Sequence, residues 1–168
     1  QDMEDVENFI KKKFNGINIF YQNKQLGTAD AVKSIKMSSL ITNFQERTLI
    51  LYGDVPLLKK ETIENFTKIE DPSIKMKILA FKKNNPKNYG RLIIDEKGDL
   101  IKVVEEIDAT KDEKKIGLCN SGILFADTKI LFELVDQIKN KNKAGEFYLT
   151  DIIELAYLRN IKTSFQEC

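Results

Sequence analysis

Apolar side chains recur along the chain with two spacings, and these spacings predict its helices and strands. Spacings of three and four residues predict an opening helix with Val6, Phe9, Ile10 and Phe14 on one face. The same spacings predict further helices, which begin at Thr28, surround Ile63 to Ile69, carry Leu131 to Ile138, and run from Phe147 to Leu158. Short β-branched and aromatic runs predict strands at 17–21, 49–52, 76–81, 122–125 and 162–165.

Between the third and fourth of these strands the pattern changes. Two apolar runs, 91–94 and 100–104, flank the turn sequence Asp95-Glu-Lys-Gly98 and predict a hairpin. A short charged helical segment is predicted near 112–115. Because helices alternate with strands elsewhere, the sequence predicts an α/β fold whose mainly parallel sheet is covered on both faces, with the β-hairpin as an insertion.

The beginning of the chain lacks a feature that such sheets usually have. A doubly wound sheet usually includes an early β-α-β unit of roughly 30 residues that carries a Gly-rich phosphate loop. No Gly-rich loop precedes Gln22. We therefore expect that the N-terminal β-α-β unit is missing from this chain and that the chain is a piece of a longer protein.

One predicted strand ends in a glycine and a lone carboxylate. The run Thr48-Leu-Ile-Leu-Tyr-Gly-Asp-Val-Pro56 is apolar up to Gly53 and Asp54. Ligands of open α/β sheets lie just beyond the carboxyl ends of the strands, and a carboxylate there suits Mg²⁺. Asp and Gly are also ordinary turn residues, so the alternative is that Asp54 only begins a turn before Pro56.

A second cluster lies where the predicted 17–21 strand leads into a helix. Gly27 and Thr28 bring free backbone N–H groups and a hydroxyl to the helix N-terminus, an arrangement that favours anions. The nearby Gln22 amide has one acceptor and two donors, so it can pair with the edge of a uracil ring. The alternative is that Thr28 is a plain helix cap.

Composition narrows the class of protein. The 168 residues suit one domain, with 42% hydrophobic and 32% charged side chains and 27 basic against 26 acidic groups. Lysines occur in short runs beside acidic or amide residues, which is typical of solvated helix faces. We therefore expect no nucleic-acid partner.

The residue types that are absent exclude several kinds of chemistry. The chain has no histidine, which excludes a histidine-based triad, metal site or general base. Its two cysteines, Cys119 and Cys168, lack a zinc or redox spacing, and we find no signal peptide or long apolar run. The sequence therefore predicts a cytoplasmic protein without membrane insertion.

Several short motifs occur along the chain in one order. They are Gln25-Leu-Gly-Thr-Ala29, Tyr52-Gly-Asp-Val-Pro-Leu57, Tyr89-Gly-Arg91, Val104-Glu105 with Asp108-Ala-Thr110, Asn120-Ser-Gly-Ile123 and Gly145-Glu-Phe-Tyr-Leu-Thr-Asp151. In this order the chain resembles the uridylyltransferase domain of the bacterial bifunctional N-acetylglucosamine-1-phosphate uridylyltransferase/glucosamine-1-phosphate acetyltransferase family. The resemblance covers nearly the whole chain and implies a Rossmann-like nucleotide-diphospho-sugar transferase fold, of which residues 1–168 are a part.

The resemblance also implies roles for individual residues. One set of residues would contact the uridine and the metal-bound phosphates: Gln22, Gly27, Thr28, Tyr52, Gly53 and Asp54. Within this set, Asp54 would be the catalytic Mg²⁺ ligand. The amino sugar would contact Gly90, Glu105 and Asn120, with Thr150 close to the same pocket. Read without the family, Gly90 could only shape a turn, Asn120 could only satisfy backbone groups, and Glu105 could be a surface carboxylate.

The implied reaction is nucleotidyl transfer. A phosphate oxygen of N-acetylglucosamine 1-phosphate attacks the α-phosphorus of UTP, and UDP-N-acetylglucosamine and pyrophosphate are formed with Mg²⁺ as cofactor. Such transfer needs positioning and charge neutralisation more than acid–base help, which agrees with a histidine-free chain. The alternatives are a glucose-1-phosphate uridylyl- or thymidylyltransferase and a non-catalytic nucleotide-binding module.

Three features of the family are missing from this chain. The family's Gly-rich loop with Arg and Lys would precede residue 1, and a second metal ligand, an asparagine, would follow residue 168. The β-helix domain that carries acetyl transfer and trimer formation is also absent. We therefore expect a homotrimeric parent protein and a chain that is inactive by itself.

Overall fold

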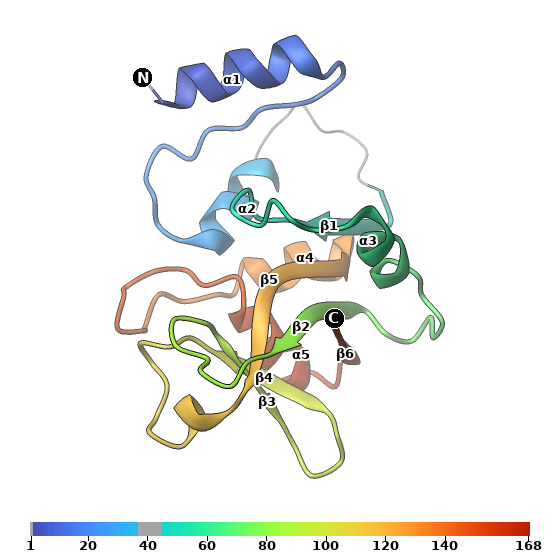
Figure 1. The fold of residues 1–168 in the computed structure, drawn as a ribbon, viewed down its shortest axis with the longest axis vertical. Helices are drawn as coiled ribbons and strands as arrows, with labels where there is room; N and C mark the ends of the chain where they lie inside the picture. The colour runs from blue at the N-terminus through green and yellow to red at the C-terminus, as the bar shows by residue number, and fades with distance from the viewer. Residues whose placement is uncertain (1, 37–44) are drawn as a thin grey trace.

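The structure is a computed structural model that describes residues 2–36 and 45–168, and its centre is a six-stranded sheet (Figure 1). The elements, in chain order, are α1 (Asp2–Lys13), α2 (Thr28–Lys36), β1 (Arg47–Ile50), α3 (Lys60–Phe66), β2 (Met76–Lys82), β3 (Arg91–Ile94), β4 (Leu100–Val104), the 3₁₀ turn η1 (Glu113–Lys115), β5 (Leu118–Asp127), α4 (Thr128–Val135), α5 (Asp151–Leu158) and β6 (Thr163–Glu167).

The sheet is mixed, so the prediction of a mainly parallel sheet is wrong. The strands follow the order β4-β3-β5-β2-β6, and β1 also pairs with β5. Strands β2 and β6 run parallel, whereas the β1–β5, β2–β5, β3–β4 and β3–β5 pairs are antiparallel. Apolar periodicity identifies a strand but not its direction, which depends on the partner it pairs with. The predicted β3–β4 hairpin is confirmed.

Strand β5 organises the sheet, because it pairs with β1, β2 and β3. Its ladder with β2 is interrupted: Ile78 pairs with Leu124 and Ala80 with Asn120, so Leu79 alone lies opposite residues 121–123. Gly122 lies inside this β-bulge with φ of +83°. A left-handed backbone conformation favours glycine, and such bulges bend a strand and redirect its side chains.

Apolar side chains pack on both faces of the sheet. Successive residues of β2 alternate, so that Ile78 and Ala80 contact the larger core cluster while Leu79 contacts the smaller one. The larger cluster includes residues of α2, α4 and α5, and the smaller one includes Phe66 of α3. Helices therefore cover both faces, as predicted, although the sheet is not parallel (Figure 1).

The first part of the chain packs least. Helix α1 forms as predicted, but Val6 and Phe9 on its apolar face are 57% and 59% exposed. Figure 1 shows α1 lying apart from the sheet. The strand predicted at 17–21 is absent from the described chain, which has neither helix nor strand between α1 and α2. An extended apolar run becomes a strand only when a neighbouring strand supplies its hydrogen bonds.

Helix α2 is joined to the rest of the fold through backbone contacts with Phe147. The N–H of Phe147 donates to the carbonyl of Leu26 at 2.8 Å, and the N–H of Ala29 donates to the carbonyl of Phe147 at 2.9 Å. Gly27 lies between these contacts with φ of +118°, and an added Cβ would come within 2.6 Å of the Phe147 carbonyl oxygen. This close approach requires glycine.

We predict that Gly27→Ala lowers the free energy of unfolding by about 2–4 kcal/mol, because left-handed strain adds to a clash with backbone. Gly98→Ala is the matched control, because Gly98 also has a positive φ, +88°, but nothing lies within 4 Å of its added Cβ. The control should lose only about 1 kcal/mol. Urea unfolding measures both, and equal losses would contradict the role given to the Phe147 contact.

Candidate functional site

A cleft of about 910 Å³ opens at the bulge of β5. Its wall is built from segments that are distant in sequence: the loop after β1, the end of β2, the turn before β3, the segment after β4, the bulge itself, and the segment before α5. Six of the ten predicted site residues line it, namely Thr28, Tyr52, Asp54, Gly90, Glu105 and Asn120. The fold thus brings most of the predicted site together.

Tyr52 is the centre of the predicted nucleotide side. Its ring lies against Gly122, where an added Cβ would come within 2.6 Å of two ring carbons. Its side chain hydrogen-bonds that of Thr28, whose hydroxyl oxygen also accepts from the backbone N–H of Leu149 at 2.9 Å. Burial raises the pKa of the Tyr52 phenol, and the Glu105 and Asp54 carboxylates add to the rise while the Thr28 hydrogen bond opposes it. Tyr52 is therefore a neutral phenol at neutral pH.

Asp54 lies exposed on the wall of the same cleft, directly after Tyr52 and Gly53. Within residues 2–36 and 45–168, no group of three or more His, Cys, Asp or Glu side chains is placed to hold a metal ion. Mg²⁺, however, is often held by one or two carboxylates together with substrate phosphates and waters. An exposed single carboxylate at a cleft fits that mode of binding.

Glu105 and Thr150 form the polar contact of the predicted sugar side. The Thr150 hydroxyl donates to Oε1 of Glu105 at 3.0 Å, and Thr150 lines a smaller cavity beside Tyr52 and Asn120. Burial raises the pKa of Glu105, the Thr150 hydrogen bond lowers it, Asp108 raises it, and Arg91 lowers it. Gly90 lies over this carboxylate, since an added Cβ would be 3.1 and 3.2 Å from its two oxygens.

Asn120 lies on the cleft wall at the bulge, where side chains supply hydrogen bonds to backbone groups. Oδ1 of Asn120 accepts from the N–H of Gly122 at 3.0 Å. The Ser121 hydroxyl donates to the carbonyl of Leu79 at 2.6 Å and accepts from the N–H of Ile123 at 3.2 Å. Asn120 therefore does satisfy a backbone group with its amide oxygen and also lines the cleft, and an amide NH₂ group can donate two hydrogen bonds.

The remaining predicted residues lie nearby but do not line the cleft. The Gln22 amide donates to the carbonyl of Gly27 at 3.0 Å and to Oδ2 of Asp30 at 2.8 Å, so it braces the start of α2. Gly27 lies close against the backbone of Phe147, and Gly53 is exposed between Tyr52 and Asp54. The structure thus gives Gln22 and Gly27 structural contacts, and their contact with a uridine stays a prediction.

Sequence reasoning missed several residues that line the cleft. Tyr89, Ile107, Glu146 and Tyr148 all do so, and none was a candidate. Tyr89, Glu146 and Tyr148 lie inside the motifs at 89–91 and 145–151, so the motifs were the available signal. What the sequence could not show is which members of a motif face inward, because that depends on how the loops fold.

An acidic cluster lies behind the predicted sugar side, where Glu105 and Tyr148 also line a neighbouring groove. Burial raises the pKa of Tyr148 to about 12, and the Asp108 and Glu105 carboxylates add to the rise. Burial likewise raises the pKa of Asp151 to about 6, with further contributions from Glu154, Glu105 and Asp108. Charged forms are disfavoured here because the carboxylates are close together and partly removed from water.

The sequence profile of one protein family matches the chain from residue 2 to residue 166, and that family is described as nucleotidyl transferase. The chain belongs to the nucleotidyl transferase family. This match supports the predicted α/β nucleotidyltransferase fold. The sheet of that fold is mixed, however, and not mainly parallel as predicted.

Curated relatives agree with this family. The chain is 38% identical over 157 residues to the bifunctional protein GlmU of Zymomonas mobilis, which covers 91% of the chain and 34% of the relative. It is 40% identical over 136 residues to the bifunctional protein GlmU of Lactobacillus johnsonii, covering 80% of the chain and 29% of the relative. The chain thus spans about a third of the length of the curated relatives it matches.

A solved structure has the same fold. It is a crystal structure described as that of a glucose-1-phosphate thymidylyltransferase from Bacillus anthracis, with a TM-score of 0.66 and 23% sequence identity. The similarity covers 99% of this chain and 63% of that one. Separately, none of the helices in the described part of the chain has the length and apolar character needed to cross a membrane.

The raised pKa of Asp151 gives a pH-dependent stability. Because its folded-state pKa, about 6, lies above its ordinary value of 3.8, the folded protein binds more protons than the unfolded chain between these pH values. The free energy of unfolding therefore falls as the pH rises through this window. Above the window, the folded protein carries the whole cost of an ionised, partly buried carboxylate.

We predict that Asp151→Asn raises the free energy of unfolding by about 1–2 kcal/mol at pH 7.5 and changes it little at pH 4. Urea unfolding at the two pH values measures this difference. Glu61→Gln, at an exposed carboxylate of α3, is the control and should show no such pH-dependent gain. An equal effect of Asp151→Asn at both pH values would show that Asp151 does not titrate as described.

Proposed function

We propose that this chain is the part of a sugar-phosphate uridylyltransferase that holds the sugar phosphate and one metal ligand. The substrates would be UTP and N-acetylglucosamine 1-phosphate, and the products UDP-N-acetylglucosamine and pyrophosphate. The observation that carries the proposal is that residues predicted for the nucleotide and for the sugar line one cleft, although they come from separate segments. Membership of the nucleotidyl transferase family supports the reaction type.

The reaction needs no proton acceptor from the protein, because the attacking sugar-phosphate oxygen is already ionised. A new bond forms between this oxygen and the α-phosphorus of UTP, while the bond from that phosphorus to the β-phosphate oxygen breaks and pyrophosphate leaves with the electron pair. The protein's task is to position two anions and to neutralise their charge. A chain without histidine can perform this task.

Each side chain has a distinct part in this proposal. Glu105, held by Thr150, would accept hydrogen bonds from sugar hydroxyls, and Asn120 would donate its amide N–H groups. Tyr52 and Thr28 would bound the nucleotide side. Asp54 is the residue that would hold Mg²⁺, which when bound offsets phosphate charge.

The first experiment measures pyrophosphate release by the full-length protein as the cell makes it. We expect Mg²⁺-dependent release with UTP and N-acetylglucosamine 1-phosphate, and a kcat/KM about 100-fold or more above that with glucose 1-phosphate. A preference for glucose 1-phosphate, or for dTTP over UTP, would favour a related transferase instead. Absence of turnover with every pair would contradict the proposed function and favour a binding module.

A second experiment tests Asp54 in the same full-length protein. Asp54→Asn keeps the side chain's shape but removes its charge, so we expect kcat to fall about 100-fold or more with little change in stability. Asp112→Asn, at an exposed carboxylate directly before η1 and outside the cleft, is the matched control and should retain full turnover. Unchanged Mg²⁺-dependent turnover of Asp54→Asn would remove Asp54 from the metal site.

A further inference from the structure

One arginine lies almost completely inside the protein beside the cleft. Arg91, the first residue of β3, is 1% exposed. A buried guanidinium is costly unless its charge is paired and its N–H groups are bonded. Within the described chain, Nε of Arg91 has no hydrogen-bond partner. Burying this charge therefore costs free energy, and the contacts of the other guanidinium nitrogens must offset that cost.

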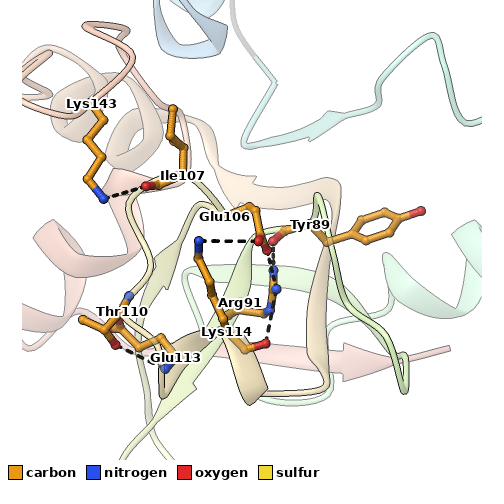
Figure 2. A network of polar contacts seen from close by, with 8 residues as sticks. All are labelled: Tyr89, Arg91, Glu106, Ile107, Thr110, Glu113, Lys114 and Lys143. Atoms are coloured by element: carbon orange, nitrogen blue, oxygen red, sulfur yellow. Dashed lines mark hydrogen bonds and ion pairs between the residues drawn. The ribbon is translucent and has the colours of Figure 1, made fainter.

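Those contacts join two strips of chain that border the cleft (Figure 2). Nη1 of Arg91 donates to the carbonyl of Tyr89, and Nη2 donates to Oε2 of Glu106 and to the carbonyl of Lys114 at 3.5 Å. The Glu106 carboxylate also accepts a backbone hydrogen bond from Asn88. The arginine and the glutamate together tie the 88–90 turn to the segment that follows β4.

The segment after β4 is anchored at its outer end by other residues. Nζ of Lys143 donates to the carbonyl of Ile107 at 2.7 Å (Figure 2). Thr110 and Glu113 form a reciprocal pair, in which the N–H of Thr110 donates to the Glu113 carboxylate at 2.8 Å and the N–H of Glu113 donates to the Thr110 hydroxyl oxygen at 3.2 Å. Arg91 and Glu106 are the anchor of this segment on the β3 side, next to Glu105.

There is little room for the 88–90 turn and the segment after β4 to shift relative to one another at this anchor. Gly90 and Glu105 are neighbours of the two anchored residues, and they approach so closely that an added Cβ on Gly90 would be 3.1 Å from a Glu105 oxygen. A shift of a few tenths of an ångström between the two strips would therefore move the Glu105 carboxylate relative to the cleft. Sites that bind polar ligands lose affinity when their groups are displaced on this scale.

We propose that Arg91, acting through Glu106, is a positioning residue that fixes the Glu105 carboxylate where the sugar phosphate binds. This inference rests on the proposed function. Arg91 belongs to the 89–91 motif, but the resemblance gives it no role, and it does not line the cleft. The inference predicts that Arg91 acts on sugar-phosphate affinity and leaves nucleotide affinity unchanged.

Arg91 also acts on Glu105 through its charge. Burial raises the pKa of Glu105, and Arg91 is a cation that lowers it. The other groups that act on this carboxylate are the Thr150 hydroxyl and the Asp108 carboxylate, and Glu105 in turn acts on Asp151, Tyr148 and Tyr52. Arg91 is thus the cation that opposes the surrounding acidic groups and favours the ionised form of Glu105.

Two substitutions of Arg91 separate its geometry from its charge. Arg91→Lys keeps the charge but cannot reproduce the planar fork that reaches both Tyr89 and Glu106. We expect it to raise KM for N-acetylglucosamine 1-phosphate about 10-fold, with kcat and KM for UTP within about 2-fold of wild type. Arg91→Met removes the charge as well, and the acid limb of the pH profile of 1/KM for the sugar phosphate should move about one pH unit higher.

A third variant keeps the test decisive if Arg91→Met does not fold. Glu106→Gln leaves the arginine in place but weakens its partner, so it should raise the sugar-phosphate KM without moving the acid limb to higher pH. Arg47→Met is the matched control: Arg47 also donates to backbone carbonyls, those of Ile74 and Lys75 at 3.2 Å, but it lies outside the cleft. It should lower stability and leave both KM values unchanged.

The outcomes distinguish this inference from the proposed function. If the unmutated full-length protein does not transfer uridylyl groups to the sugar phosphate, the proposed function is wrong. If the unmutated protein is active but Arg91→Lys and Glu106→Gln leave the sugar-phosphate KM unchanged, the positioning role alone is wrong. Parallel changes in kcat and both KM values, as for a general loss of structure, would also overturn it.

Discussion

The arrangement of this protein depends on one irregular strand. Strand β5 pairs with three other strands, and its bulge is made possible by the left-handed conformation of Gly122. The bulge leaves backbone groups without ladder partners, and Asn120 and Ser121 supply hydrogen bonds in their place. Because Gly122 has no side chain, the Tyr52 ring can lie against the strand. The same irregularity thus bends the sheet, opens the cleft and places Tyr52 and Asn120 on its wall.

The carboxylates on the two sides of the cleft differ in how far they are buried and how close they lie to other acidic groups. The proposed sugar side gathers Glu105 and Asp151 beside the Asp108 carboxylate, and burial together with the neighbouring carboxylates raises the pKa values of Glu105 and Asp151. For Glu105, the Thr150 hydroxyl and the buried guanidinium of Arg91 oppose this rise. Asp54, on the proposed nucleotide side, lies exposed on the cleft wall. The fold therefore separates a partly buried carboxylate suited to hydroxyl groups from an exposed one suited to a cation.

Much of the secondary structure follows from local sequence, and its failures have identifiable reasons. The helix from Thr28 and the β3–β4 hairpin form where apolar spacing and turn residues predict them, and the helix around Phe66 also forms but ends at Phe66, before Ile69. The final helix begins at Asp151 and not at Phe147, because the backbone of Phe147 is bonded to Leu26 and Ala29 of the α2 region. The 17–21 run remains without a ladder because a strand needs a partner, and strand direction was mistaken because periodicity does not encode it.

The sequence by itself determined most of the helices and strands, the absence of histidine chemistry and the motifs that resemble a nucleotidyltransferase, because these depend on residue type and spacing. It also singled out Asp54, Glu105 and Asn120, which the fold brings to one cleft. Only the tertiary structure decided that the sheet is mixed, that Gln22 braces α2, and that Arg91 is buried beside Glu105. These features arise from contacts between residues far apart in the chain, whose geometry no local pattern specifies.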